Sequence, residues 1–314
     1  MTRDLKGYFF ILLGATLLGS IGVLGRAIYQ YELDPIKVVT YRGIIAAILL
    51  IGTLAIFSPE KLKLKLKDLP FFAIYGFLSV TMTFILFFYA IKYTTVAMAT
   101  ILIYTYPAWV LLFSLLILNE KLDKQKIVAL LLTFSGCLLV VQIYNPSVLK
   151  FNLKGIIYGL FCSLGAASYT LFGKKATFKY DSWTVVSYAL GFGALFLLFF
   201  RGPHTLLNFN YPETAWVLIF TLAIVPTLLG YSFYTRGLKY LEASRAGIIA
   251  TWEVVVATIL AFIIFGEKLT LVQILGAFLI FWGIFIIKKR RDAIECVSIA
   301  GAGVKLLPHN KEMK

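Results

Sequence analysis

The sequence is poor in charge, in cysteine and in histidine. Only 14% of its 314 residues are charged, and it contains three cysteines and two histidines. Cys137, Cys162 and Cys296 have no metal-binding spacing and imply no disulfide framework. His204 and His309 lie outside the long apolar runs, so no Ser/His or Cys/His pairing indicates a catalytic centre. We therefore expect no metal, no cofactor and no enzymatic activity.

Apolar residues, in contrast, are abundant. They make up 60% of the chain, which is more than a soluble core could bury. The apolar runs are about 17–25 residues long, enough to cross a bilayer as helices, and they lack the alternation of barrel strands. The sequence therefore predicts an all-α integral membrane protein. Its ten transmembrane helices are expected at residues 7–28, 36–57, 70–91, 96–118, 127–144, 155–173, 183–200, 215–236, 246–265 and 271–287.

Positive charge is concentrated at one set of helix ends. The formal net charge is +15. If the N-terminus is cytoplasmic, most lysines and arginines fall at inner ends and loops. The outer ends hold only Arg26, Lys37, Lys92, Lys150, Lys154, Arg201 and Lys268. This bias predicts a multi-pass protein of the inner (plasma) membrane with both termini in the cytoplasm, and it explains the charge without nucleic-acid binding.

The two halves of the chain repeat each other. Tyr104–Leu122 returns in altered form 147 positions later, so that Asn119-Glu120-Lys121-Leu122 corresponds to Gly266-Glu267-Lys268-Leu269. We place the first repeat at 1–148, the second at 149–290 and a cytoplasmic tail at 291–314. Five helices per repeat is an odd number, so the second repeat should be inverted in the membrane. Inverted repeats around a central site are typical of secondary transporters.

Several of these residues resemble one known family. The features that carry the resemblance are Tyr106-Pro107 and Glu253 within the fourth and ninth helices, the Asn/Gly-Glu-Lys-Leu that ends them, Gly136, Gly283, and Tyr41-Arg42. They are similar to the EamA branch of the drug/metabolite transporter superfamily over nearly all of residues 5–290. Where the family often has Glu-Pro in the ninth helix, Glu253 is here followed by Val254.

The resemblance implies a ten-helix carrier of small metabolites. Members move amino acids, nucleobases, choline-like cations, sugars or toxic compounds. The resemblance further implies a central pocket lined by helices 1, 3, 4, 6, 8 and 9, with the helix pairs 3–4 and 8–9 moving as gates.

Two full charges lie well inside the predicted spans, where an ion is costly. Glu253 is about 10 Å from the inner end of the ninth helix. It could couple protons or hold a substrate amine, and the alternative is a structural bond to a neighbouring helix. Arg42 could hold a substrate carboxylate. Its alternatives are packing of the second helix against carbonyl groups, or snorkelling outward.

Hydroxyl and aromatic side chains recur at helical spacing on the expected gate helices. Because lipid offers hydroxyls no partner, we expect them to face the bundle interior. The alternative is interhelical hydrogen bonding without substrate contact. The predicted substrate-binding residues are Ser20, Tyr75, Ser79, Thr83, Thr100, Tyr104, Pro107, Thr227, Tyr231, Tyr234, Trp252 and Glu253. Pro107 is also expected to kink its helix. A stripe of small residues, Gly155, Gly159, Ser163 and Ala167, is expected to pack the sixth helix against a neighbour.

Together these features favour a secondary carrier that exports amino acids or related small metabolites by alternating access. Aromatic faces beside Glu253 would also suit choline-like or polyamine cations. A membrane-embedded enzyme is the alternative from another class, but no nucleophile or metal cluster supports it. The expected partners are a small-molecule substrate, the lipid bilayer and protons as a candidate coupling ion. The sequence is compatible with a monomer or a homodimer.

Overall fold

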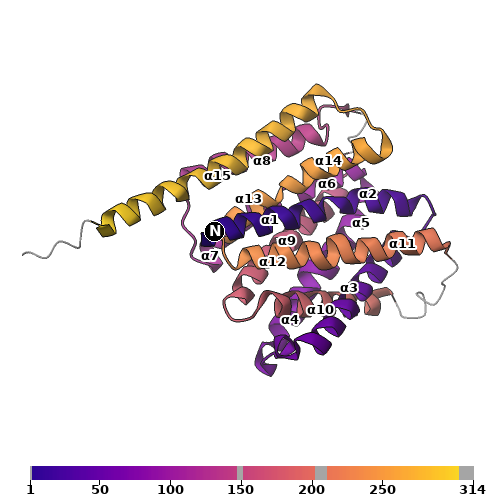
Figure 1. Cartoon of the computed structure of the whole chain (residues 1–314). Coiled ribbons are helices and arrows are strands. Elements are labelled where there is room, and N and C mark those ends of the chain that lie inside the picture. The colour runs from indigo at the N-terminus through magenta and orange to yellow at the C-terminus, as the bar shows by residue number, and fades with distance from the viewer. Residues whose placement is uncertain (1, 147–150, 202–210, 304–314) are drawn as a thin grey trace, which may run out of the picture.

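The computed structural model describes residues 2–146, 151–201 and 211–303. These residues form helices, turns and loops, without a strand among them, so the all-α prediction is confirmed. Within the same residues, nine helices are long and apolar enough to cross a membrane. They are Arg3–Tyr29, Pro35–Phe57, Leu66–Tyr93, Val96–Ile117, Leu153–Thr177, Ser182–Phe200, Glu213–Leu238, Ala243–Phe265 and Leu271–Lys288. The chain therefore has the architecture of an integral membrane protein (Figure 1).

Short interruptions divide several of these spans into separate elements. The symbol η marks short 3-10 or π-helical segments. In chain order the elements are α1 (Arg3–Leu18), α2 (Ser20–Tyr29), α3 (Pro35–Phe57), η1 (Pro59–Leu62), η2 (Leu66–Asp68), α4 (Leu69–Gly76), η3 (Phe77–Met82), α5 (Thr83–Tyr93), α6 (Val96–Ile103), α7 (Tyr106–Ile117), α8 (Lys124–Val140), α9 (Leu153–Thr177), α10 (Ser182–Arg201), α11 (Glu213–Leu222), η6 (Ala223–Gly230), α12 (Tyr231–Leu238), α13 (Ala243–Ala250), α14 (Trp252–Phe265) and α15 (Leu271–Gly303).

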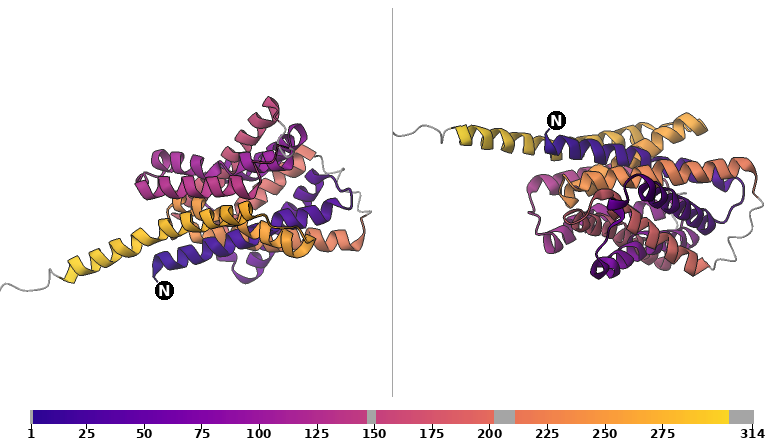
Figure 2. Two further views of the ribbon diagram at one scale, coloured as in Figure 1. Left: turned by 90° about the horizontal axis from the view of Figure 1, so that it is seen from above. Right: turned by 60° about the horizontal axis from the view of Figure 1, so that its bottom comes forward.

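The fifth predicted span corresponds to α8, which is only 17 residues long. It is therefore shorter than the nine helices above, and the total of ten spans remains a prediction. It ends at Val140 rather than near residue 144, and Gln142 beyond it has a left-handed backbone (φ 61°). α15 continues to Gly303, so the first part of the predicted tail is helical. Figure 2 shows this end of α15 projecting beyond the rest of the bundle.

The helix starts have local causes. Asp34, Thr95, Asp123 and Asn152 each precede a helix and accept a hydrogen bond from a backbone N–H of its first turn. Such caps satisfy donors that the helix itself leaves unpaired.

The ends of α7 and α14 also have a local cause. Asn119 (φ 52°) and Gly266 (φ 66°) follow these helices in the left-handed conformation, which asparagine and glycine tolerate best. These are the first residues of the two repeated Asn/Gly-Glu-Lys-Leu segments. That part of the motif is therefore a helix stop.

The helix interruptions recur at the spacing of the sequence repeat. The break between α6 and α7 has a counterpart between α13 and α14, because Val96–Ile103 shifted by 147 residues is Ala243–Ala250. The π-helical segments η3 and η6 also correspond within one residue. In Figure 1, α7 and α13 lie toward one end of the bundle, whereas α6 and α14 lie toward the other.

The two breaks share a backward-bonded threonine, Thr105 or Thr251, but only the first also has a proline. Pro107 stands at the start of α7, where its missing N–H cannot continue the helix from α6. The second break has no proline, and the kink therefore does not require one. There the Thr251 hydroxyl donates to the carbonyl of Ile248 at 2.6 Å, and the Thr251 N–H donates to the same carbonyl. A threonine bonded in this way bends a helix.

α8 and α15 pack along each other at glycines. A Cβ added at Gly136 would lie 2.6 Å from the carbonyl oxygen of Gly276 and 2.7 Å from Ile280. A Cβ added at Gly283 would lie 2.7 Å from Thr133 and 3.0 Å from the Ala129 carbonyl oxygen. Gly283 corresponds to Gly136, Ala129 to Gly276 and Thr133 to Ile280, and the two members of each pair are 147 positions apart. The contact is therefore reciprocal, as in a two-fold interface.

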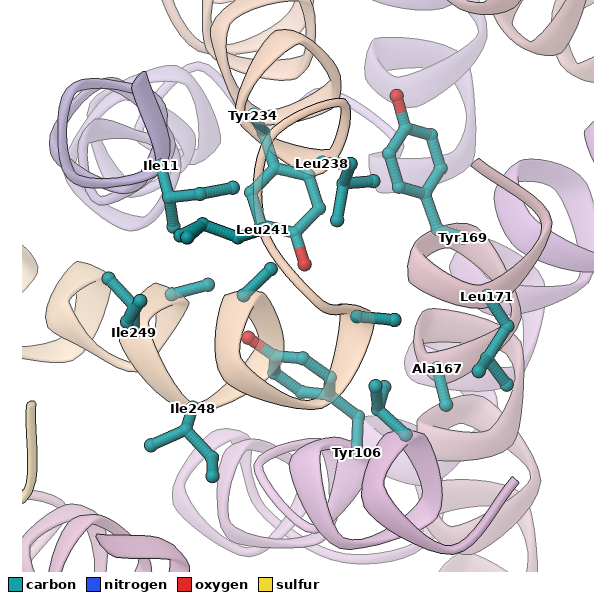
Figure 3. Packing of buried hydrophobic residues seen from close by; sticks show 14 of the residues in the cluster. Ile11, Tyr106, Ala167, Tyr169, Leu171, Tyr234, Leu238, Leu241, Ile248 and Ile249 are labelled. Atoms are coloured by element: carbon teal, nitrogen blue, oxygen red, sulfur yellow. The ribbon is translucent and has the colours of Figure 1, made fainter. Parts of the chain in front are cut away.

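The small-residue stripe of α9 packs as expected. Gly155 lies against Tyr93 and Thr94, and an added Cβ at Gly159 would meet Leu102. Nearby, the largest buried cluster brings together Tyr106, Tyr169 and Tyr234 from three different spans (Figure 3).

The glycine contact predicts a specific stability loss. Gly136→Ala should lower the unfolding midpoint, because overpacking of this kind costs about 1–3 kcal/mol. Gly52→Ala is the matched control, because no atom lies within 4 Å of an added Cβ in this helix interior. Its midpoint should stay equal or rise. Thermal unfolding in detergent measures both, and equal midpoints for the two variants would contradict the proposed close packing.

Candidate functional site

The candidate site forms where the two helix breaks meet. The Tyr106 hydroxyl donates to the carbonyl of Gly247 at 3.2 Å and so joins α7 to α13. Tyr104 is the C-cap of α6, and Glu253 lies in the first turn of α14. The helix ends therefore place one tyrosine and one carboxyl group together in the middle of the bundle.

Glu253 faces protein groups rather than lipid. Its side chain lies close enough to Tyr104 for the two groups to interact electrostatically. Side chains of α7, α8 and α12 also interact electrostatically with Glu253; they are Tyr106, Cys137, Tyr231 and Tyr234. The side chain is nevertheless only half-buried. The first turn of a helix favours a negative charge, so this position suits a carboxylate that meets ligands or protons.

Arg42 occupies a second polar position, on α3. Its side chain is 2% exposed and its guanidinium lies 4.2 Å from the centre of the Phe84 ring. Tyr29 and Tyr231 interact with it electrostatically. Tyr231 interacts electrostatically with Glu253 as well, so both charged groups lie near this tyrosine.

Five of the predicted site residues are buried and already hydrogen-bonded. Tyr75 donates to the carbonyl of Tyr169 (3.1 Å), Ser79 pairs with Ser168 (2.7 Å) and Tyr234 pairs with Thr170 (2.8 Å). Thr83 and Thr227 each donate to a carbonyl five residues earlier, Leu78 and Leu222, at the two π-helical segments. In this conformation these five side chains join helices or stabilise helix interruptions.

The remaining predicted residues differ in accessibility. Ser20, Thr100, Tyr104, Tyr231, Trp252 and Glu253 keep part of their surface exposed, whereas Pro107 is buried. The hydroxyls of Ser20 and Thr100 donate to carbonyls of their own helices. Trp252 donates from Nε1 to the Thr16 hydroxyl at 3.2 Å. Tyr104 and Tyr231 both interact electrostatically with Glu253, so these three half-buried residues form the centre of the candidate site.

The structure adds residues that the sequence analysis did not select. The ring of Tyr169 on α9 lies 4.7 Å from that of Tyr231, and its hydroxyl pairs with Thr235. Ser163 accepts hydrogen bonds from the Thr105 hydroxyl and from Trp109, both at 2.9 Å. Ser163 and Thr170 are seven residues apart, which is helical spacing, so they meet the criterion used for the other helices and could have been found. Tyr169 does not follow from that spacing.

A cavity of about 300 Å³ lies elsewhere, between α14, α15 and the end of α8. Its lining is mainly apolar, and its rim includes the exposed side chains of Ile259, Ile274, Phe278 and Phe281. In a membrane-spanning chain these residues face lipid. Of the predicted site residues, Trp252 alone lines this cavity, so we do not assign the small-molecule site to it.

One end of the bundle is closed by a network of charged side chains. The Glu120 carboxylate accepts hydrogen bonds from the backbone N–H groups of Ala243 (2.5 Å) and Ser244 (3.1 Å) at the start of α13. Lys126, which is 1% exposed, pairs with Glu242 at 3.1 Å and lies 3.9 Å from Glu120. The network therefore holds the start of α8 against the start of α13.

Arg245 extends this network. It pairs with Glu242 at 2.8 Å and lies 3.9 Å from Asp123. Burial disfavours the charged form of Glu242, but Arg245 and Lys126 outweigh it and hold the pKa of Glu242 below its ordinary value of 4.5. Because this pKa is depressed, the stabilisation is present above pH 4.5 and is lost as the pH falls through the lower folded value.

The corresponding position in the second half lacks such a network. Glu267, the counterpart of Glu120, pairs with Arg26, and both side chains are about half exposed. Arg26 also lies 4.3 Å from the centre of the Phe265 ring. Lys126 is replaced there by Gln273. The two ends of the bundle are thus held by interactions of very different strength.

Comparison with known proteins shows similarity over almost the whole chain. The profile of the EamA-like transporter family matches residues 5–142 and 153–288. An uncharacterized transporter of Archaeoglobus fulgidus is 30% identical over 276 residues, covering 88% of this chain and 94% of its own length. The uncharacterized inner membrane transporter YicL of Salmonella typhimurium is 26% identical over 299 residues, covering 92% and 97%. A crystal structure shares the fold, with a TM-score of 0.75 at 18% identity over 93% of this chain and 98% of that chain.

The charge network predicts unequal effects at the two repeated glutamates. Glu120→Ala should reduce stability by roughly 3–5 kcal/mol, because it removes a buried partner of Lys126 and the acceptor for two N–H groups. Glu267→Ala is the matched control and should cost less than about 1 kcal/mol, because its ion pair is exposed. Thermal unfolding in detergent compares them. Losses of equal size would show that the network does not hold the α8 and α13 ends together.

Proposed function

The chain belongs to the EamA-like transporter family, and on that premise we propose that it is a secondary carrier that exports amino acids or related small metabolites by alternating access. Its relatives are named as uncharacterized transporters, one of them of the inner membrane, which supports transport as the general activity. The substrate class, the direction of transport and the inner-membrane location are parts of the proposal.

An inverted repeat would provide the required mechanism. It is supported by the matching helix interruptions, by the placement of α6 with α14 and of α7 with α13 at opposite ends, and by the reciprocal glycine contacts. Two similar halves that pack about a pseudo-two-fold axis can exchange conformations. The central site then opens to one side of the membrane at a time.

The charge network suggests which side is closed in this structure. Glu120, Lys126 and Arg245 lie at the ends that the distribution of lysine and arginine places in the cytoplasm. The opposite end is held by the exposed pair of Arg26 and Glu267. We infer that the structure corresponds to the state closed on the cytoplasmic side, and that transport requires the network to separate.

The observation that carries the proposed site is the placement of Tyr104 and Glu253 at the two helix breaks, close enough to interact electrostatically. A half-buried carboxylate in mid-membrane can accept a substrate ammonium group or a proton. A choline-like or polyamine cation is the second candidate substrate, because Tyr104 lies close to this carboxylate and offers an aromatic ring.

Flux measurements with purified protein in proteoliposomes test the function. Labelled amino acids and amines should move, and they should accumulate when a pH gradient is imposed if protons are coupled. Glu253→Gln keeps the shape but removes the titratable group, so it should abolish accumulation driven by the gradient.

Three other outcomes would change the interpretation. Accumulation by the Glu253→Gln variant equal to that of the unaltered protein would rule out Glu253 as the coupling residue. Equilibration without accumulation would indicate a facilitator. Absence of flux for every amino acid and amine would contradict the proposed substrate class.

A further inference from the structure

We propose that Arg42 is the seat for a carboxylate group of the substrate, so that the transported compound carries a carboxylate as well as any amine held near Glu253. This inference rests on the proposed transport function. It concerns the chemical class of the substrate, and it assigns Arg42 a binding role rather than a structural one.

The first argument is that buried donors of Arg42 are unsatisfied. The Nε and Nη2 atoms are buried and have no hydrogen-bond partner among the described residues. The ion pairs found within those residues do not include Arg42 either. A buried donor without a partner is destabilising, and a charged one more so. A structural arginine would be expected to bond to helix carbonyls, which is the alternative raised by the sequence.

The second argument is the geometry of these two donors of Arg42 that have no hydrogen-bond partner among the described residues. Nε and Nη2 lie along one edge of the planar guanidinium group and present two N–H donors in the same direction. This edge matches the two oxygens of a carboxylate, which accept a pair of parallel hydrogen bonds. Phe84 covers the face of the guanidinium at 4.2 Å, so a ligand would approach along the edge.

The third argument is the position of Arg42 relative to the site already described. Tyr231 packs against two buried clusters, one containing Tyr104 and Trp252 and the other containing Phe84. It interacts electrostatically with Arg42 and with Glu253. An acceptor for an amine and a donor pair for a carboxylate therefore both lie near one tyrosine.

The fourth argument concerns access. Tyr29, the last residue of α2, interacts with Arg42 and stands near the end of the bundle opposite the charge network. Because Arg42 is only 2% exposed, a ligand can reach it only when the surrounding helices separate. A site that is covered in one state and open in another is what alternating access requires.

The test compares labelled amino acids with their amides, which keep the amine but lack the carboxylate. In proteoliposomes the unaltered protein should favour the amino acid by roughly 10- to 100-fold over the amide. Arg42→Met should reduce amino-acid flux to the level of the amide and leave amide flux unchanged. Arg42→Lys keeps the charge but not the paired donors, so its preference should be intermediate.

Thermal unfolding keeps the inference separate from a simple loss of folding. If the buried donors are vacant, Arg42→Met should have an unfolding midpoint equal to or higher than that of the unaltered protein. A clearly lower midpoint would identify Arg42 as structural. Amino acids should raise the midpoint of the unaltered protein but not that of Arg42→Met. A rise caused by sodium chloride alone, with no further effect of amino acids, would overturn the carboxylate assignment in favour of an inorganic anion.

The outcomes also separate this inference from the proposed function. If the unaltered protein moves neither amino acids nor amides, the proposed substrate class fails. If it moves both equally and Arg42→Met does the same, transport stands and the carboxylate seat is overturned.

Discussion

Lipid offers no hydrogen-bond partner, so each polar group within the bilayer must find one inside the protein, and the interruptions of the helices follow from this constraint. At the two π-helical segments, Thr83 and Thr227 each donate to a carbonyl five residues earlier. At the two breaks, Thr105 and Thr251 donate to a carbonyl three residues earlier. Irregular backbone is thus tolerated in mid-membrane because nearby hydroxyls satisfy it. Among the described residues in the interior of the spans, the Ser232 hydroxyl and two donors of Arg42 depart from the rule, and Arg42 is the one that carries a charge.

The two halves share their packing and differ in their charges. Glycines at the α8–α15 contact and left-handed residues after α7 and α14 recur at the same offset, because they are set by backbone geometry. Glu120 and Glu267 recur in the sequence but not in environment. The first is surrounded by buried cations and helix N–H groups, whereas the second has one exposed partner. A repeated fold can therefore carry an unequal energy balance between its two ends.

The positions of the spans could be predicted from the sequence, because a run of apolar residues of bilayer length has few alternatives. Local chemistry also predicted the break at Pro107. The break at Thr251 could not be predicted, because threonine is compatible with an unbroken helix and bends one only when its hydroxyl bonds backwards. Tyr75 and Tyr231 likewise lie on similar polar stripes, but one is buried and bonded to α9 and the other is half exposed. That difference, like the missing partners of Arg42, depends on neighbours that are distant in the sequence.

The unequal causes of the two breaks have a mechanical consequence. In the first half, Pro107 has no N–H to give, so α6 and α7 can never join into one regular helix. In the second half, the carbonyl of Ile248 is held by the Thr251 hydroxyl and N–H, which can rotate away and be replaced by the N–H of Trp252. Only the second joint therefore has the backbone donors that a regular helix needs. Glu253 stands one residue beyond Trp252, so straightening of this joint would rotate and displace its carboxylate while Tyr104 stays at a fixed corner.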